Sequence, residues 1–175
     1  IPSLFLRKTI WRVLSWFGPR NIVPKLFPGS TLCFFDVKKH PGVKGYVAFS
    51  IDDGFCGEDN PGGTMLTEVL HLFREHNAKA TFFVAGSHCD AASTSLVHQL
   101  LEAGHELANH NREDRPYHRD SKVSFLKDIE ATDRVIRDMG AEPAPWYRAP
   151  HAKFSRSMQN VLDERGLTHV MLDCF

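Results

Sequence analysis

The chain has 175 residues, of which 42% are hydrophobic and 24% are charged, and its 21 basic and 21 acidic residues balance. This composition is typical of a soluble globular domain with its own core, and the lack of a basic excess argues against a nucleic-acid partner. No apolar run is long enough to span a membrane. The four cysteines lack the C-x-x-C spacing of a zinc cluster, and the sequence does not decide whether they form one or two disulfides. They are Cys33, Cys56, Cys89 and Cys174.

The start of the chain differs in pattern from the rest. Apolar and basic residues over 4–17 have the spacing of a short amphipathic helix. We expect this helix to pack on the domain, with a membrane-surface role as the alternative. Prolines and glycines make the next segment irregular, although 31–37 has the composition of a strand. We therefore divide the chain into a lead-in, 1–42, and a domain, 43–175.

Strand and helix patterns alternate through the domain. The expected strands are 46–51, 80–84, 105–108, 146–148 and 168–174, and the expected helices lie near 64–76, 95–103, 121–139 and 155–165. Asp120 or Ser121 is expected to begin the third helix, and Ser155 the fourth. Such alternation favours parallel strands covered by helices, as an open sheet or a barrel. No G-x-G-x-x-G follows the first strand, which disfavours a dinucleotide-binding fold.

Polar side chains gather where three of these strands end. Asp52 and Asp53 follow the first strand, residues 109–114 follow the third, and residues 148–151 follow the fourth. Because parallel strands end at the same edge of a sheet, these side chains are expected to meet there, at the end where α/β barrels carry their chemistry. The alternative for the two aspartates is a tight turn in which they cap the backbone.

A metal ion is one reason to hold two neighbouring carboxylates together, because they otherwise repel each other. Asp53, His110 and Asp114 would surround one cation and leave positions open for water and substrate. Zinc suits this set, and its carboxylate oxygens also admit cobalt, nickel, manganese or iron. Taken alone, a histidine such as His110 is more often an ordinary loop histidine than a metal ligand.

Four motifs in order resemble one known family. They are Phe49–Gly54, similar to T-F-D-D-G; Ala80–Val84, similar to A-T-F-F-V; Gly104–His110, similar to G-H-E-I-G-N-H; and Tyr147–His151, similar to F-R-P-P-Y. Together they resemble the polysaccharide deacetylases, which are carbohydrate esterase family four, or the NodB-type domain. The resemblance runs from Val43 to the end of the chain.

The resemblance implies an α/β fold, a distorted parallel (β/α) barrel, with metal-dependent N-deacetylase activity. By position, Asp52 resembles the general base and Asp53 the first metal ligand. His110 resembles the second ligand. Arg148 resembles the residue that keeps the base charged and oriented. The backbone N–H of His151 resembles an oxyanion donor.

The sequence departs from the family pattern at two places. Asp114 stands where the H-[ST]-x-x-H motif has its second histidine. A second carboxylate makes the ligand set harder in the sense of hard and soft ligands. The alternatives are His118 as the third ligand, or a metal-poor site. His151 replaces the usual tyrosine. The general acid and the last strands are expected beyond Phe175, so we expect the barrel to be truncated at its C-terminal end. We also expect the chain to be a piece cut at both ends. These 175 residues alone are therefore expected to be inactive.

The resulting function hypothesis is a hydrolase that removes N-acetyl groups from chitin or a related N-acetylglucosamine polymer, with Asp52 as base to a metal-activated water. A non-sugar amidase on the same fold and a degenerate, non-catalytic glycan-binding domain are the rivals. The expected partner is a carbohydrate. The residues leave the oligomeric state and compartment open, and the resemblance points to secretion or the cell surface.

Overall fold

The structure is a computed structural model that describes residues 25, 31–55, 65–91 and 94–172. The helix expected at 4–17 lies outside the described residues, as do Cys56 and Cys174. Among the residues described, no helix has both the length and the apolar character needed to cross a bilayer.

A single parallel sheet of five strands forms the centre of the described chain. The strands are β1 (Phe49–Ile51), β2 (Ala80–Val84), β3 (Glu106–Asn109), β4 (Trp146–Tyr147) and β5 (Thr168–His169). They pair in sequence order, β1-β2-β3-β4-β5, so each connection leads to the next neighbour and the order never reverses. An open doubly wound sheet would reverse its order, whereas a barrel winds in one direction. The fold is therefore of the barrel type.

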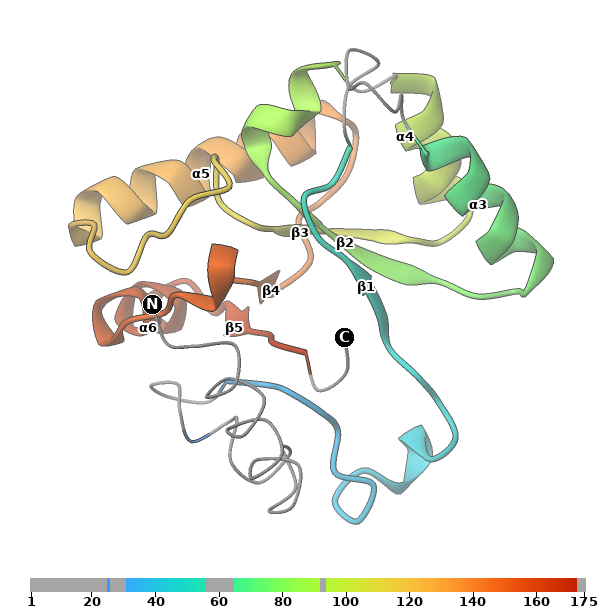
Figure 1. Cartoon of the computed structure of the whole chain (residues 1–175), viewed down its shortest axis with the longest axis horizontal. Coiled ribbons are helices and arrows are strands. Elements are labelled where there is room, and N and C mark those ends of the chain that lie inside the picture. The colour runs from blue at the N-terminus through green and yellow to red at the C-terminus, as the bar shows by residue number, and fades with distance from the viewer. Residues whose placement is uncertain (1–24, 26–30, 56–64, 92–93, 173–175) are drawn as a thin grey trace, which may run out of the picture.

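In the described part of the chain, four α-helices follow the strands and cover the outside of the curled sheet (Figure 1). They are α3 (Leu66–Glu75), α4 (Thr94–Glu102), α5 (Lys122–Asp138) and α6 (Arg156–Glu164). Ser121 and Ser155 cap the last two helices, because their hydroxyls accept the N–H groups of Ser124 and Met158 at 3.1 and 3.3 Å. Both caps confirm the helix starts predicted from the sequence.

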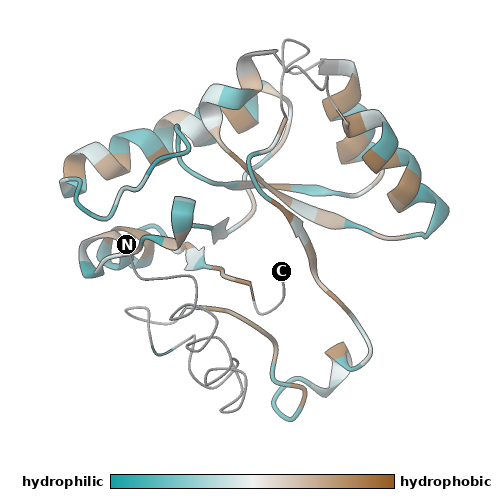
Figure 2. Ribbon diagram, viewed as in Figure 1, coloured by the Kyte–Doolittle hydropathy of each residue, from teal (hydrophilic) through white to brown (hydrophobic). Residues whose placement is uncertain are grey.

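The core lies between the helices and the sheet. Figure 2 shows apolar stripes on the helix faces turned toward the strands. The apolar side chains of β2 and β3 pack against α3, α4 and α5 in one cluster, and those of β4 pack against α5 and α6 in another. Their most buried members include Phe82, Val84, Leu100, Leu107, Phe125, Ile129, Ile136, Tyr147 and Leu162. These contacts fix α5 across the ends of β3 and β4, where the candidate site lies.

The observed strands β1, β4 and β5 are shorter than the strands predicted at 46–51, 146–148 and 168–174. Tyr46 and Val47 precede β1 and are 82% and 74% exposed, because the pairing with β2 begins only at Phe49. Residues 31–37 form no strand, and Leu32 makes only an isolated bridge to Val170. The sequence pattern detects extended apolar segments, but pairing with a neighbour decides where a strand begins and ends.

His169 on β5 is a buried histidine that the sequence analysis did not single out. It is 1% exposed, its Nδ1 lies 2.9 Å from the Thr31 hydroxyl, and its ring stacks on Phe154 with centroids 3.8 Å apart. Burial, together with the nearby charge of Arg148, lowers the pKa of His169 to about 3. The folded protein therefore holds this imidazole neutral at pH values where the unfolded chain protonates it.

We expect this histidine to make the protein acid-labile. Its pKa is about 6.5 when unfolded and about 3 when folded, so stability is present above pH 6.5 and falls as the pH drops toward 3, by at most about 1.4 kcal/mol per pH unit. Urea unfolding between pH 7 and pH 4 measures this slope. His169→Phe keeps the stacking and should flatten the slope even if it lowers stability overall. An unchanged slope would show that other groups cause the acid lability.

Candidate active site

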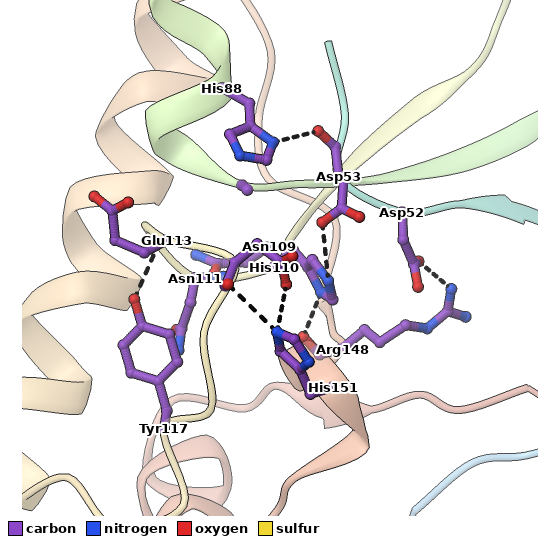
Figure 3. Close-up of polar contacts among 12 residues, drawn as sticks. Asp52, Asp53, His88, Asn109, His110, Asn111, Glu113, Tyr117, Arg148 and His151 are labelled. Carbon is purple, nitrogen blue, oxygen red and sulfur yellow. Dashed lines mark hydrogen bonds and ion pairs between the residues drawn. The ribbon is translucent and has the colours of Figure 1, made fainter. Parts of the chain in front are cut away.

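The three polar strand ends meet at one edge of the sheet, as the sequence predicted. Asp52 and Asp53 follow β1, His110 follows β3, and Arg148 follows β4 (Figure 3). The parallel pairing of these strands brings residues nearly 100 positions apart into direct contact.

Arg148 is buried beneath this edge and holds Asp52. Its Nη1 donates to Oδ1 of Asp52 at 2.5 Å and to the hydroxyl of Ser50 at 2.9 Å, and its Nε donates to the carbonyl of Val170 at 3.3 Å. The guanidinium also lies 4.0 Å from the ring centroid of Phe83. Burial lowers the pKa of Arg148, and the charge and hydrogen bond of Asp52 oppose this effect. Asp52 is thus an oriented carboxylate beside a fixed positive charge.

Asp53 turns away from Arg148 because the backbone bends sharply after β1. Asp53 and Gly54 have φ values of 65° and 57°, both in the left-handed region. A Cβ at Gly54 would lie 3.2 Å from the Cα of Val84, so this close approach requires glycine. His88 supports the turn, because its Nδ1–H donates to the Asp53 carbonyl at 3.0 Å. The two neighbouring aspartates therefore face different partners.

His110 presents one ring nitrogen to Asp53. Its Nδ1–H donates to the Arg148 carbonyl at 2.7 Å, which leaves the Nε2 lone pair facing Oδ1 of Asp53 at 3.6 Å. Burial lowers the pKa of His110, and the charge of Asp52 is the main opposing influence. A neutral imidazole with a free Nε2 lone pair is the form of histidine that binds metals.

The residues around Asp53 fit a divalent cation. Asp53, His110 and Asp114 each offer one ligand atom, and these atoms lie within 4.8 Å of one another. Oδ1 of Asp53 is buried and has no hydrogen-bond partner among the described residues. A buried acceptor facing a nitrogen lone pair is unfavourable unless a cation or proton lies between them. His118, the alternative third ligand, is not part of this group.

Asp114 lies on a loop that its own side chains hold in place. The Tyr117 hydroxyl accepts the N–H of Glu113 at 3.0 Å. Arg115 forms a two-pronged ion pair with Asp120 at 3.0 and 2.7 Å. Asp114 itself contacts the predicted site residue His151, whose Nε2 lies 3.2 Å from its Oδ1. All six predicted site residues therefore gather at this edge of the sheet.

Asn109 belongs to the polar strand end noted in the sequence, but the sequence analysis assigned it no role. Its side-chain amide donates to Oδ1 of Asp133 at 2.8 Å and to the Ile129 carbonyl at 2.9 Å, both on α5. Its Oδ1 accepts the N–H of Asn111 at 2.8 Å. Asn109 thus fixes the backbone on both sides of His110. The sequence feature that could have indicated this role of Asn109 was Asp133, a charged residue four positions after Ile129 on the inward face of α5.

Comparison with known proteins identifies the family of this site. Residues 39–170 match the polysaccharide deacetylase family. The chain belongs to this family. The match includes the three strand ends described above, so the deacetylase resemblance predicted from the four motifs is confirmed.

Individual deacetylases and esterases are similar to this chain. A peptidoglycan-N-acetylglucosamine deacetylase of Bacillus cereus is 37% identical over 131 residues, which are 75% of this chain and 58% of that protein. A family 4 carbohydrate esterase from Streptomyces lividans, solved with acetate, is 26% identical with a TM-score of 0.63, over 73% of this chain and 62% of that one. A family 4 acetyl xylan esterase from Clostridium thermocellum, solved with cobalt, is 29% identical with a TM-score of 0.59, over 71% and 56%. The chain thus spans less than two thirds of each relative.

Proposed function

We propose that the protein is a metal-dependent hydrolase that removes N-acetyl groups from an amino-sugar polymer such as chitin or peptidoglycan. One arrangement carries this proposal: Arg148 holds the Asp52 carboxylate beside the group of Asp53, His110 and Asp114. A charged base next to a cation site is what hydrolysis of an unactivated amide needs. The 37% identity to the Bacillus cereus peptidoglycan-N-acetylglucosamine deacetylase supports an amino-sugar substrate.

Asp53, His110 and Asp114 are proposed to hold the ion. A divalent ion there would act as a Lewis acid toward water and the acetyl carbonyl. Its identity is proposed as zinc, with cobalt the first alternative because the 29% identical acetyl xylan esterase was solved with cobalt. Iron, nickel and manganese also suit a set of two carboxylates and one imidazole.

The chain's own residues would then divide the work of amide hydrolysis. Asp52 takes a proton from the attacking water while the water oxygen forms its bond to the acetyl carbon. Arg148, which is 5% exposed at its side chain, keeps Asp52 oriented through this transfer. The backbone N–H of His151 is proposed to donate to the oxyanion. The carbon–nitrogen bond then breaks as the nitrogen gains a proton, which balances the proton that Asp52 took from water, and acetate and the free amino sugar are released.

Acetate release from a set of acetylated substrates tests this proposal. We expect the full-length protein, loaded with Zn²⁺, to deacetylate chitin oligomers or peptidoglycan, and to lose this activity after chelation and regain it when Zn²⁺ is restored. Acetylxylan tests the O-acetyl specificity that the acetyl xylan esterase relative suggests, and a panel of small amides tests a non-sugar amidase.

Each substrate result has a distinct meaning. Release from acetylxylan or small amides alone would keep the chemistry and reject the amino-sugar substrate. No release from any substrate, together with no stoichiometric metal in elemental analysis, would favour the degenerate glycan-binding alternative.

A further inference from the structure

His151 makes a side-chain contact that the proposed mechanism does not use. Its Nε2 lies 3.2 Å from Oδ1 of Asp114 and 3.4 Å from the Asp114 carbonyl oxygen. The carbonyl oxygen accepts the hydrogen bond, so Nε2 carries the hydrogen, and the carboxylate oxygen is in contact with the same nitrogen. Figure 3 shows the His151 ring on the same side of the site as His110, with dashed lines leaving its nitrogen.

The backbone at His151 is unusual in a way that serves this contact. His151 and Ala152 have φ values of 55° and 54°, both in the left-handed region without a glycine. Such residues cost of order 1 kcal/mol or more each and persist where the surroundings require them. The turn is closed by the N–H groups of Ala152 and Lys153, which donate to Ala149 and Pro150 at 3.1 and 3.2 Å. The His151 side chain is thereby carried toward the loop of Asp114.

A second hydrogen bond between an imidazole and a backbone carbonyl joins residues 148–151 to the candidate cation group. The carbonyl of Arg148 accepts from Nδ1 of His110 at 2.7 Å and so fixes which nitrogen of that ring faces Asp53. Partners of this kind around ligands orient them and set their basicity. Residues 148–151 therefore contact two of the three residues in the candidate cation group.

We infer that His151 is a positioning residue for Asp114: its Nε2–H donates to the Asp114 carbonyl and its ring nitrogen contacts one carboxylate oxygen, and together these contacts orient the carboxylate for the cation. This inference rests on the proposed function, because it assigns Asp114 as a ligand. Asp114 is 41% exposed at its side chain, so nothing in a packed core fixes its rotamer. The contacts of His151 with the carbonyl and the carboxylate of Asp114 replace that missing constraint.

A matched pair of variants separates this role from general packing. Glutamine places an N–H donor where His151 has Nε2–H, and methionine has a similar length and no donor. His151→Met is expected to weaken Zn²⁺ binding by about 10- to 100-fold, and His151→Gln to recover most of the loss. Binding is measured by competition with a chromophoric chelator, and the absorption bands of the Co²⁺-loaded protein report the ligand geometry. The side chain is 48% exposed, so the melting temperatures of the metal-free variants should stay near that of the wild type.

The background variant Asp114→Ala shows whether His151 acts through Asp114. There, His151→Met should have no further effect on Zn²⁺ affinity, because the carboxylate that it orients is absent. Equal affinity of His151→Met and the wild type would overturn the inference, as would an undiminished effect in the Asp114→Ala background. If either of these results is obtained while the protein still binds Zn²⁺ through Asp53, the inference about His151 fails and the proposed function stands. A wild-type protein that binds neither Zn²⁺ nor Co²⁺ would overturn both.

Discussion

Replacing Asp53 with alanine in the full-length protein is expected to weaken Zn²⁺ binding by more than about 100-fold. The loss of a residue that only hydrogen-bonds to a metal ligand already lowers metal affinity by about 10- to 100-fold, and the loss of a ligand itself costs more. Oδ1 of Asp53 is buried without a hydrogen-bond partner among the described residues and lies 3.6 Å from Nε2 of His110. Its removal takes one charge and one ligand from the group. Deacetylation should fall to background at any Zn²⁺ concentration that does not denature the protein.

The three members of the group should differ in their effects. His110→Ala is expected to match Asp53→Ala, because His110 is 4% exposed and rigidly held. Asp114→Ala should cost less, because Asp114 is 41% exposed and water can replace its carboxylate. Isothermal titration with Zn²⁺ measures the order.

Glu113→Gln is the matched control for these variants. Glu113 carries the same charge on the loop of Asp114, but its side chain is 52% exposed and it does not belong to the group. It should bind Zn²⁺ as the wild type does. Wild-type affinity in both Asp53→Ala and His110→Ala would sink the assignment of the ligands.

The fold was largely predictable because it rests on local patterns. The strand of Ala80–Val84 is apolar except for Thr81, and the helices after Ser121 and Ser155 begin at side-chain caps. Both features can be predicted from neighbouring residues. The short strands β4 and β5 have only two residues each. Their bounds depend on pairing with distant residues, which no local pattern contains.

The site was predictable where strand ends carry unusual residues, and not where its support comes from other elements. Asp52, His110 and Arg148 stand in motifs directly after strands. Asn109 makes its contacts with α5, and Ser50 receives its hydrogen bond from Arg148, 98 positions away. Such contacts form only when the sheet brings these elements together.

Asp52 and Arg148 are expected to act as one unit, distinct from the group that is proposed to hold the ion. Asp52→Asn should lower kcat by about 10²- to 10⁴-fold, the usual contribution of a general base, while Zn²⁺ affinity stays within a few-fold of the wild type. Asparagine keeps the shape of the side chain and accepts from Arg148, so the fold should persist. A large loss of Zn²⁺ affinity would instead make Asp52 a ligand.

Arg148→Lys is the companion variant. Lysine keeps the positive charge, but it lacks the fork that reaches Ser50, Asp52 and the Val170 carbonyl together. It should lower kcat while leaving Zn²⁺ affinity near the wild-type value. The double variant with Asp52→Asn should be little worse than Asp52→Asn alone, because an orienting residue has no further effect once the base is lost. If the two losses multiply instead, Arg148 contributes to the transition state independently of Asp52, for example by direct contact with the substrate.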